Sequence, residues 1–171
     1  MTYARVAVTG LSVALMVASG IGCDGDDDAA EPLEMTVDGP IPQGDPAALL
    51  DWLGGGGYLD WEAESAVHDG TGPHFGAVRT YFTEDLIASL TAENTEHPAG
   101  SATVKELSGS GDRVIGWSVS IKTADDSDDG NGWYWYEYFE GSVIAEGDGI
   151  SICTGCHAGG RDYVLSPFPL Q

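Results

Sequence analysis

Residues 132–139 read GWYWYEYF, and this short stretch does most to decide the fold class. Two kinds of aromatic side chain alternate along it: Trp133, Trp135 and Phe139 on one side, Tyr134, Tyr136 and Tyr138 on the other. A period of two is typical of a β-strand, because successive side chains point to opposite faces of a sheet. Aromatic residues also pack well on a pleated surface. The stretch therefore predicts a strand with two distinct aromatic faces.

Neighbouring segments extend this pattern. Residues 113–123 alternate apolar and polar side chains, and residues 74–82, 101–107 and 143–146 also have strand character. Helices are expected at residues 47–53, directly after Pro46, and from the cap residue Thr83 to about residue 93, with acidic residues in the first turn. The sequence thus predicts an α+β, mainly β fold: an antiparallel sheet with a few short helices.

The charge balance narrows the classes of function. The 171 residues carry a formal charge of −22, from 28 acidic and 6 basic side chains. Nucleic-acid binding is excluded in practice, because neutralising phosphates requires clustered Lys and Arg. A cationic redox partner would fit such a surface, and so would a solvated acidic surface with no specific partner. The length suits one domain with a single core.

The N-terminus has the features of an export signal. Arg5 precedes an apolar run over residues 6–21, which is shorter than the roughly 20 residues that span a bilayer. Cys23 follows the sequence SGIG, which resembles a lipobox except that Gly20 stands where Leu is usual; ordinary cleavage near Gly20 or Gly22 is the alternative. We therefore expect a lipoprotein-like signal peptide at residues 1–22, with lipidation of Cys23. An acidic, Pro-rich tether should follow at residues 23–45 and one folded domain at residues 46–171, on the periplasmic face of a bacterial membrane or the cell surface, with a lipid anchor as the only membrane attachment.

The domain assignment depends on residues 153–157, which read CTGCH. Cys-x-x-Cys-His is the attachment sequence of c-type haem, in which both thiols form thioethers and the histidine binds the iron. Cys153 and Cys156 would hold the haem, His157 would be the axial ligand, and residues 46–171 would form a haem domain. With Cys23 assigned to lipid, all three cysteines are used. A strained disulfide and half of a zinc site are the alternatives, but no second CxxC or His-x3-5-His supplies further zinc ligands.

A second axial ligand is hard to find in the sequence. Met1 and Met16 lie in the signal segment, and Met35 lies in the Pro-rich tether. The other histidines could bind the iron, but each occupies a turn-like context and is expected at the surface: His68, His74 and His97. The sequence therefore predicts a five-coordinate iron with an open distal side.

Four blocks between residues 76 and 164 resemble the cytochrome P-460 family, which includes the cytochromes c′-β. They are residues 76–81 (GAVRTY), 100–107 (GSATVKEL), 132–135 (GWYW) and the CTGCH motif followed by Asp162-Tyr163-Val164. The order of the blocks makes the resemblance more specific than CxxCH alone. It covers residues 74–167, a little over half of the chain.

The resemblance implies roles for several residues. Lys105 falls at the lysine that is cross-linked to the porphyrin in the enzymatic members, and Arg79 falls at a distal-pocket arginine. Members of the family oxidise hydroxylamine, sometimes with nitric oxide, whereas the c′-β branch binds small gases without the cross-link. The chain departs from the pattern in its short loop at residues 107–114 and in the distal acid, for which Glu146 and Asp148 are the nearest candidates.

The residues taken alone leave simpler roles open. Arg79 could pair with one of the many acids, Lys105 could be a solvated strand lysine with Lys122 as the alternative cross-link site, and the tyrosines of residues 132–139 could form a homodimer surface. Three functions remain: a haem enzyme or sensor for hydroxylamine or nitric oxide, a monohaem electron-transfer lipoprotein with a redox protein partner, and a non-haem domain with a CxxC staple.

Overall fold

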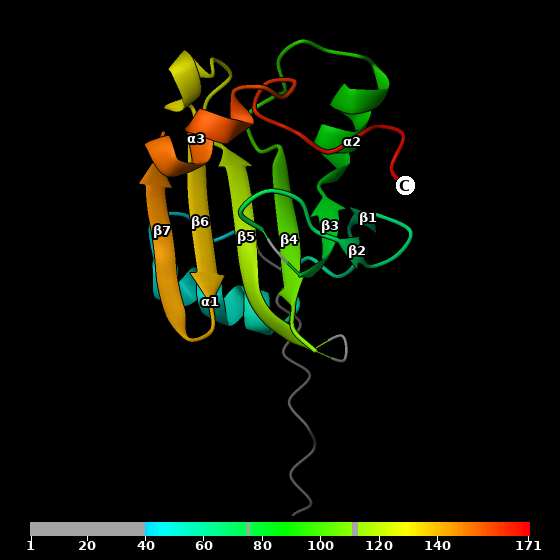
Figure 1. Cartoon of the computed structure of the whole chain (residues 1–171). Coiled ribbons are helices and arrows are strands. Elements are labelled where there is room, and N and C mark those ends of the chain that lie inside the picture. Colours follow the sequence, from blue (N-terminus) through cyan, green and yellow to red (C-terminus); the bar gives the residue numbers. More distant parts are fainter. Residues whose placement is uncertain (1–39, 75, 111–112) are drawn as a thin grey trace, which may run out of the picture. The chain divides into compact units, whose positions relative to one another are not determined.

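Seven strands form one antiparallel sheet in the computed structural model, which describes residues 40–74, 76–110 and 113–171. The spatial order is β1-β3-β4-β5-β6-β7, with β2 also paired to β3 (Figure 1). The strands are β1 (Glu62–Ala63), β2 (His68–Asp69), β3 (Ala77–Phe82), β4 (Ala102–Ser108), β5 (Val114–Lys122), β6 (Trp133–Phe139) and β7 (Ser142–Asp148). From β3 to β7 each strand pairs with the next one along the chain. The predicted antiparallel, mainly β class is confirmed.

Three short α-helices accompany the sheet: α1 (Pro46–Gly54), α2 (Glu84–Thr91) and α3 (Ser151–His157). Helix α1 begins as its sequence predicts, because the Asp45 carboxylate accepts hydrogen bonds from the amides of Ala47 and Ala48 at 3.1 Å and Pro46 occupies the first turn. Before α2, Thr83 uses its hydroxyl differently and accepts a hydrogen bond from the Ala102 amide at 2.9 Å. Helix α3 was not among the helices predicted from the sequence.

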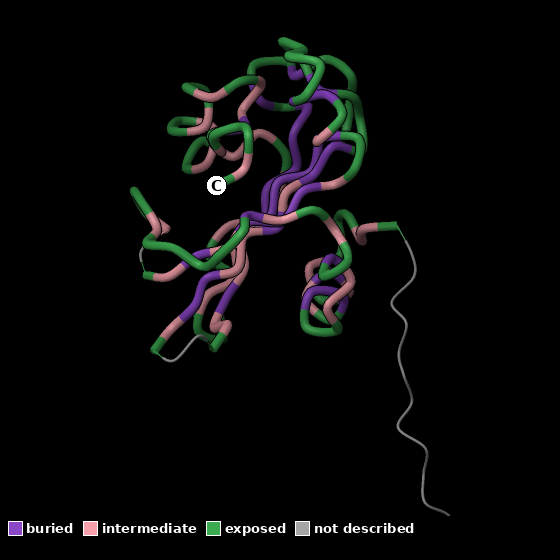
Figure 2. Tube along the Cα trace, turned by 90° about the vertical axis from the view of Figure 1, so that its right-hand side faces the viewer, coloured by how far each residue is buried: buried purple, intermediate pink, exposed green. Residues whose placement is uncertain are grey.

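The sheet separates two apolar clusters. Figure 2 shows buried residues along the strands and exposed residues in the turns and loops. One side, called the α1 face, packs against α1 through Leu49, Trp52, Leu53, Tyr58, Tyr81, Ala102, Val104, Val119, Ile121, Tyr134 and Tyr136. The other side, called the α3 face, carries Phe82, Leu86, Leu90, Trp133, Trp135 and Val164, with Cys153 of α3 packed against them. The alternation along β6 therefore divides its tryptophans and tyrosines between two different cores, as the period of two requires.

Two of the three tyrosines of β6 are core residues. Tyr134 is 4 % exposed and Tyr136 is 1 % exposed, and both pack in the cluster of the α1 face, whereas Tyr138 is partly exposed. The prediction of a surface position is therefore wrong for Tyr134 and Tyr136, and the homodimer stays a prediction. None of the helices formed by the described residues has the length and apolar character needed to cross a membrane. The predicted signal peptide, Cys23 and the tether up to residue 39 lie outside the described residues.

Candidate functional site

Helix α3 presents the CTGCH motif beside the upper ends of β6 and β7 (Figure 1). Both cysteines are free thiols; Cys153 is half-buried and Cys156 is exposed. Residues three apart lie on the same side of a helix, so the two sulfur atoms can be reached by one planar group. Burial and the nearby Glu137 raise the pKa of the Cys153 thiol to about 11. The motif thus combines a protected thiol with an accessible one.

His157 ends α3 in a defined orientation. Its Nδ1 donates a hydrogen bond to the carbonyl oxygen of Tyr163 at 2.8 Å, and its ring packs edge-on against Trp135 with 4.6 Å between the ring centres. Nε2 has no hydrogen-bond partner among the described residues. Burial, together with the Lys105 ammonium, lowers the pKa of His157 and favours the neutral imidazole. A histidine held through Nδ1 by a backbone carbonyl has the arrangement of a metal ligand that binds through Nε2.

A buried ion pair fixes the turn that follows α3. The Asp162 carboxylate accepts hydrogen bonds from the Lys122 ammonium of β5, from the Ser127 hydroxyl and from the His97 amide. The side chains of Lys122 and Asp162 are 0 % and 2 % exposed. Burial alone would raise the pKa of Asp162, but these donors outweigh it and hold that pKa below its usual range. This Lys122–Asp162 pair positions Tyr163, and through it His157, relative to the sheet.

Lys105 and Glu137 lie on the same face as His157. The strand registers pair Thr80 with Lys105, Lys105 with Ser118 and Ser118 with Glu137, so these four side chains form one row across β3 to β6. Glu137 alternates with Trp135 on β6, which assigns the row to the α3 face. Burial lowers the pKa of Lys105 and raises the pKa of Glu137. Each group is therefore shifted towards its neutral form.

His74, between β2 and β3, reaches the same site. Its side chain is 13 % exposed, its Nδ1 lies 3.6 Å from a carboxylate oxygen of Glu137, and its ring centre lies 6.5 Å from that of His157. Burial, Lys105 and His157 lower the pKa of His74 to about 4. The prediction of a surface position is wrong for His74 and for His97, which is 1 % exposed, whereas the His68 side chain is 50 % exposed.

Arg79 does not join this site. It alternates with Thr80 on β3 and so lies on the α1 face, where its Nε donates to the Glu64 carbonyl at 2.9 Å and its guanidinium lies over the Tyr81 ring, 5.2 Å from its centre. Arg79 thus lies on the opposite face of the sheet from Lys105 and Glu137, and its role as a distal-pocket arginine stays a prediction. The alternation along β3 separates Arg79 from Thr80, the member of the row on that strand.

Neither predicted distal acid lies on the α3 face. Glu146 pairs with Tyr136 and Asp148 pairs with Tyr134, and the Tyr134 hydroxyl donates to Glu146 at 3.3 Å. Paired residues of neighbouring strands share a face, so both acids lie on the α1 side of β7. Two other acids lie near the row instead: Glu137 on β6, and Glu64, which is 5 % exposed and accepts a hydrogen bond from the Thr80 amide at 2.7 Å. Glu137 is the one whose side chain belongs to the row. Its place opposite the tyrosines in residues 132–139 is the signal that could have identified it.

The residues present fit a covalently bound haem. The motif supplies two thiols and one imidazole on a short helix, and a haem needs no further protein ligand than these. Around them, Thr80 Oγ1, His74 Nδ1 and Trp135 Nε1 are buried without a hydrogen-bond partner among the described residues, as expected where a group with its own polar atoms belongs. In the same part of the chain, no three His, Cys, Asp or Glu side chains are grouped to hold a bare metal ion, so the zinc alternative finds no further ligands there.

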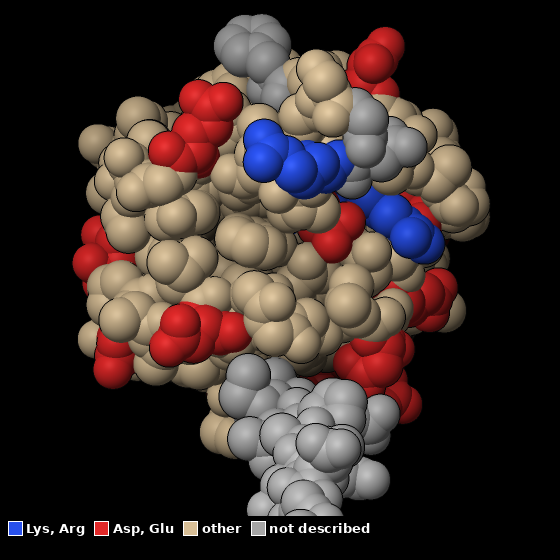
Figure 3. All heavy atoms as spheres, turned by 90° about the horizontal axis from the view of Figure 1, so that it is seen from below, with Lys and Arg blue, Asp and Glu red and all other residues tan. Residues whose placement is uncertain are grey.

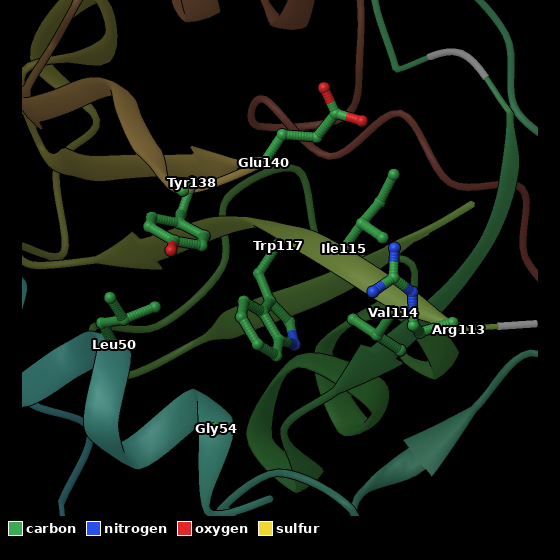
Figure 4. Close-up of a pocket in the computed structure, with 9 residues that line it drawn as sticks. Leu50, Gly54, Arg113, Val114, Ile115, Trp117, Tyr138 and Glu140 are labelled. Carbon is green, nitrogen blue, oxygen red and sulfur yellow. The ribbon is translucent and has the colours of Figure 1, made fainter.

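A separate cleft of about 530 Å³ lies on the α1 face (Figure 4). It is lined by Leu50 of α1, Trp117 and Tyr138 of the sheet, and the charged residues Arg113 and Glu140. None of its lining residues is a cysteine or a histidine. Seen from the end of the sheet opposite α3, acidic side chains are spread around the rim and basic ones are few (Figure 3).

Two comparisons with known proteins bear on these assignments. No protein-family model matches the chain, and no curated protein is significantly similar to it. The resemblance to the cytochrome P-460 family therefore stays a prediction from the four sequence blocks.

Proposed function

We propose that this chain is an exported monohaem c-type cytochrome, with the haem bound through thioethers at Cys153 and Cys156 and the iron bound by Nε2 of His157. The arrangement of His157 carries the proposal. Its Nδ1 is engaged by the Tyr163 carbonyl, the turn that carries Tyr163 is fixed by a buried ion pair, and both thiols lie within the preceding turn of the helix. A bound haem would supply a redox-active iron with an axial position for a small ligand.

Small nitrogen species, hydroxylamine or nitric oxide, are the proposed ligands or substrates. Lys105 and Glu137 are the ionisable members of the row that faces α3. With its pKa raised, the Glu137 carboxyl can hold a proton nearer neutral pH than an exposed carboxyl and can exchange it with a bound ligand. With its pKa lowered, the Lys105 amine is more often the neutral nucleophile that a porphyrin cross-link requires. Glu137 thus replaces Glu146 and Asp148 as the candidate proton donor.

A second candidate function is electron transfer to a redox protein without catalytic turnover. The position of His74 favours it, because a second imidazole opposite His157 is typical of an iron that exchanges electrons rather than substrates. Both functions share the covalent haem and export, with a lipid anchor if Cys23 is acylated.

The test is expression of the full chain with a c-type haem maturation system, followed by intact mass measurement and a pyridine haemochrome assay. We expect a red protein whose mass is increased by one haem. The matched control is the double variant Cys153→Ala, Cys156→Ala, which should carry no covalent haem. A colourless wild-type protein with unchanged mass would refute the proposal. Spectra recorded with nitric oxide and with hydroxylamine then distinguish ligand binding and oxidation from electron transfer alone.

A further inference from the structure

Two imidazoles face one another across the α3 face. The His74 and His157 rings are separated by 6.5 Å between their centres, and their planes are inclined by 71°. The two residues come from different parts of the fold: His157 ends α3, and His74 lies in the connection between β2 and β3. Their proximity is a tertiary arrangement that the sequence separation of 83 positions does not impose.

The separation matches one shared metal. With metal–nitrogen bonds of about 2 Å on each side, the centres of two imidazoles that bind a single metal through Nε2 lie roughly 6 to 6.5 Å apart. A direct hydrogen bond between the rings would bring the centres closer, whereas an edge-on aromatic contact also occurs at this separation. Among the described residues neither ring donates to or accepts from the other.

His157 is held from the side of Nδ1, where it donates a hydrogen bond to the Tyr163 carbonyl at 2.8 Å, and an acceptor beside one ring nitrogen is how proteins orient the other nitrogen towards a metal. Nδ1 of His74 is buried without a hydrogen-bond partner among the described residues, and a carboxylate oxygen of Glu137 lies 3.6 Å from it. The backbone holds His74 closely as well: the amide of Gly70 donates to the Gly76 carbonyl at 2.7 Å, and a Cβ at Gly70 would collide with the His74 carbonyl.

We propose that His74 is the second axial ligand of the haem iron in the resting protein, so that the iron is six-coordinate and the distal side is closed by a side chain of this chain. This inference rests on the proposed covalent haem. It replaces the open distal side that the sequence predicts with an occupied one. A small nitrogen ligand must then displace His74 before it reaches the iron. Its apparent affinity equals the affinity for the open iron multiplied by the fraction of protein in which His74 is released.

The test compares wild-type holoprotein with His74→Ala and with the matched control His68→Ala, whose side chain is 50 % exposed. Optical and electron paramagnetic resonance spectra of the ferric forms should show a low-spin iron in the wild type and in His68→Ala, and a high-spin iron in His74→Ala. Added imidazole should restore the low-spin spectrum of His74→Ala. Nitric oxide should bind His74→Ala about tenfold faster or more. If His74→Ala fails to fold, His74→Met provides a second variant, because methionine fills a similar length with a thioether in place of the imidazole. Its optical and electron paramagnetic resonance spectra should differ from those of the wild type.

The outcomes separate the two proposals. Wild-type protein that contains haem but has a high-spin iron would overturn the assignment of His74 and leave the cytochrome intact. The assignment of His74 also fails if His74→Ala holds haem and stays low-spin. Wild-type protein without covalent haem would overturn the proposed function itself.

Discussion

The Tyr163 carbonyl accepts the Nδ1 proton of His157 at 2.8 Å, and the residue before Tyr163 is fixed to β5 by the buried Lys122–Asp162 pair. Asp162 and Tyr163 both have positive φ, 46° and 68°, in a turn that the sheet holds in place. The candidate axial ligand is therefore oriented by the central sheet as well as by its own helix.

Breaking the buried pair should destabilise the fold strongly. Asp162→Asn leaves the Lys122 ammonium without its charged partner, and removing one member of a buried ion pair costs about 3–5 kcal/mol. Urea unfolding measures this loss as a lower midpoint. The control is Asp60→Asn at an exposed position, which should change the free energy of unfolding by less than about 0.5 kcal/mol. Equal effects of the two substitutions would contradict the role assigned to Asp162.

His97 should make the fold sensitive to mild acid. Burial lowers the pKa of His97 in the folded protein, whereas the unfolded chain binds a proton near the ordinary value of 6.5. The contribution of His97 is fully present above that value and is lost as the pH falls towards the lowered folded pKa, by at most about 1.4 kcal/mol per pH unit. Unfolding free energies measured between pH 7.5 and 5 should therefore fall less steeply in His97→Gln than in the wild type.

The contribution of His68 to stability should depend on pH in the opposite direction to that of His97. Its hydrogen bond to the Asp69 carbonyl raises the pKa of His68, so its contribution is present below the unfolded pKa and is lost as the pH rises through the folded pKa. His68→Gln should thus remove a small stabilisation at the acid end, which solvent weakens because the side chain is half exposed. If both variants changed the slope in the same direction, the assignment for His97 would fail.

The strands could be predicted because they carry their own signal. Alternation within residues 113–123 and 132–139 identified β5 and β6 and correctly divided the side chains of each strand between two faces. Helix α3 carries no such signal: Thr154 and Gly155 have low helix propensity, and the helix depends on packing of Cys153 against the α3 face. Its formation is a consequence of tertiary structure.

The composition of the site needed information that alternation cannot provide. Period two places Arg79 and Thr80 on opposite faces of one strand, but only the strand registers show that Lys105, Ser118 and Glu137 are aligned across the sheet. The family blocks named Arg79 and Lys105 together, although they lie on opposite faces. The position of His74 beside His157 could not be predicted from the sequence, because it depends on the path of the connection between β2 and β3 rather than on any periodic pattern.

The turn between β5 and β6 should tolerate no side chain at Gly130. Its φ is +99°, and a Cβ would lie 2.7 Å from Cγ2 of Thr154 on α3. Gly130→Ala therefore combines backbone strain of roughly 1–2 kcal/mol with a clash against α3, the helix that carries the CTGCH motif. Gly141→Ala is the matched control, since its φ is +90° and nothing lies within 4 Å of its Cβ. We expect Gly130→Ala to lose more stability and to lower the yield of covalent haem, whereas equal losses would show that α3 does not pack closely on this turn.

Lys105 should be tested by the position of the Soret band. Its neutral amine, favoured by burial, can attack an oxidised porphyrin edge, and such a cross-link would move the ferrous Soret band to longer wavelength. Lys105→Ala should then return the band to the position of an ordinary c-type haem while Cys153 and Cys156 keep the haem attached. Arg79→Ala is the informative control, because Arg79 lies on the α1 face and its loss should leave the spectrum unchanged. A Soret band that is already ordinary in the wild type would rule out the cross-link, and a shift in Arg79→Ala would show that the haem reaches the opposite side of the sheet.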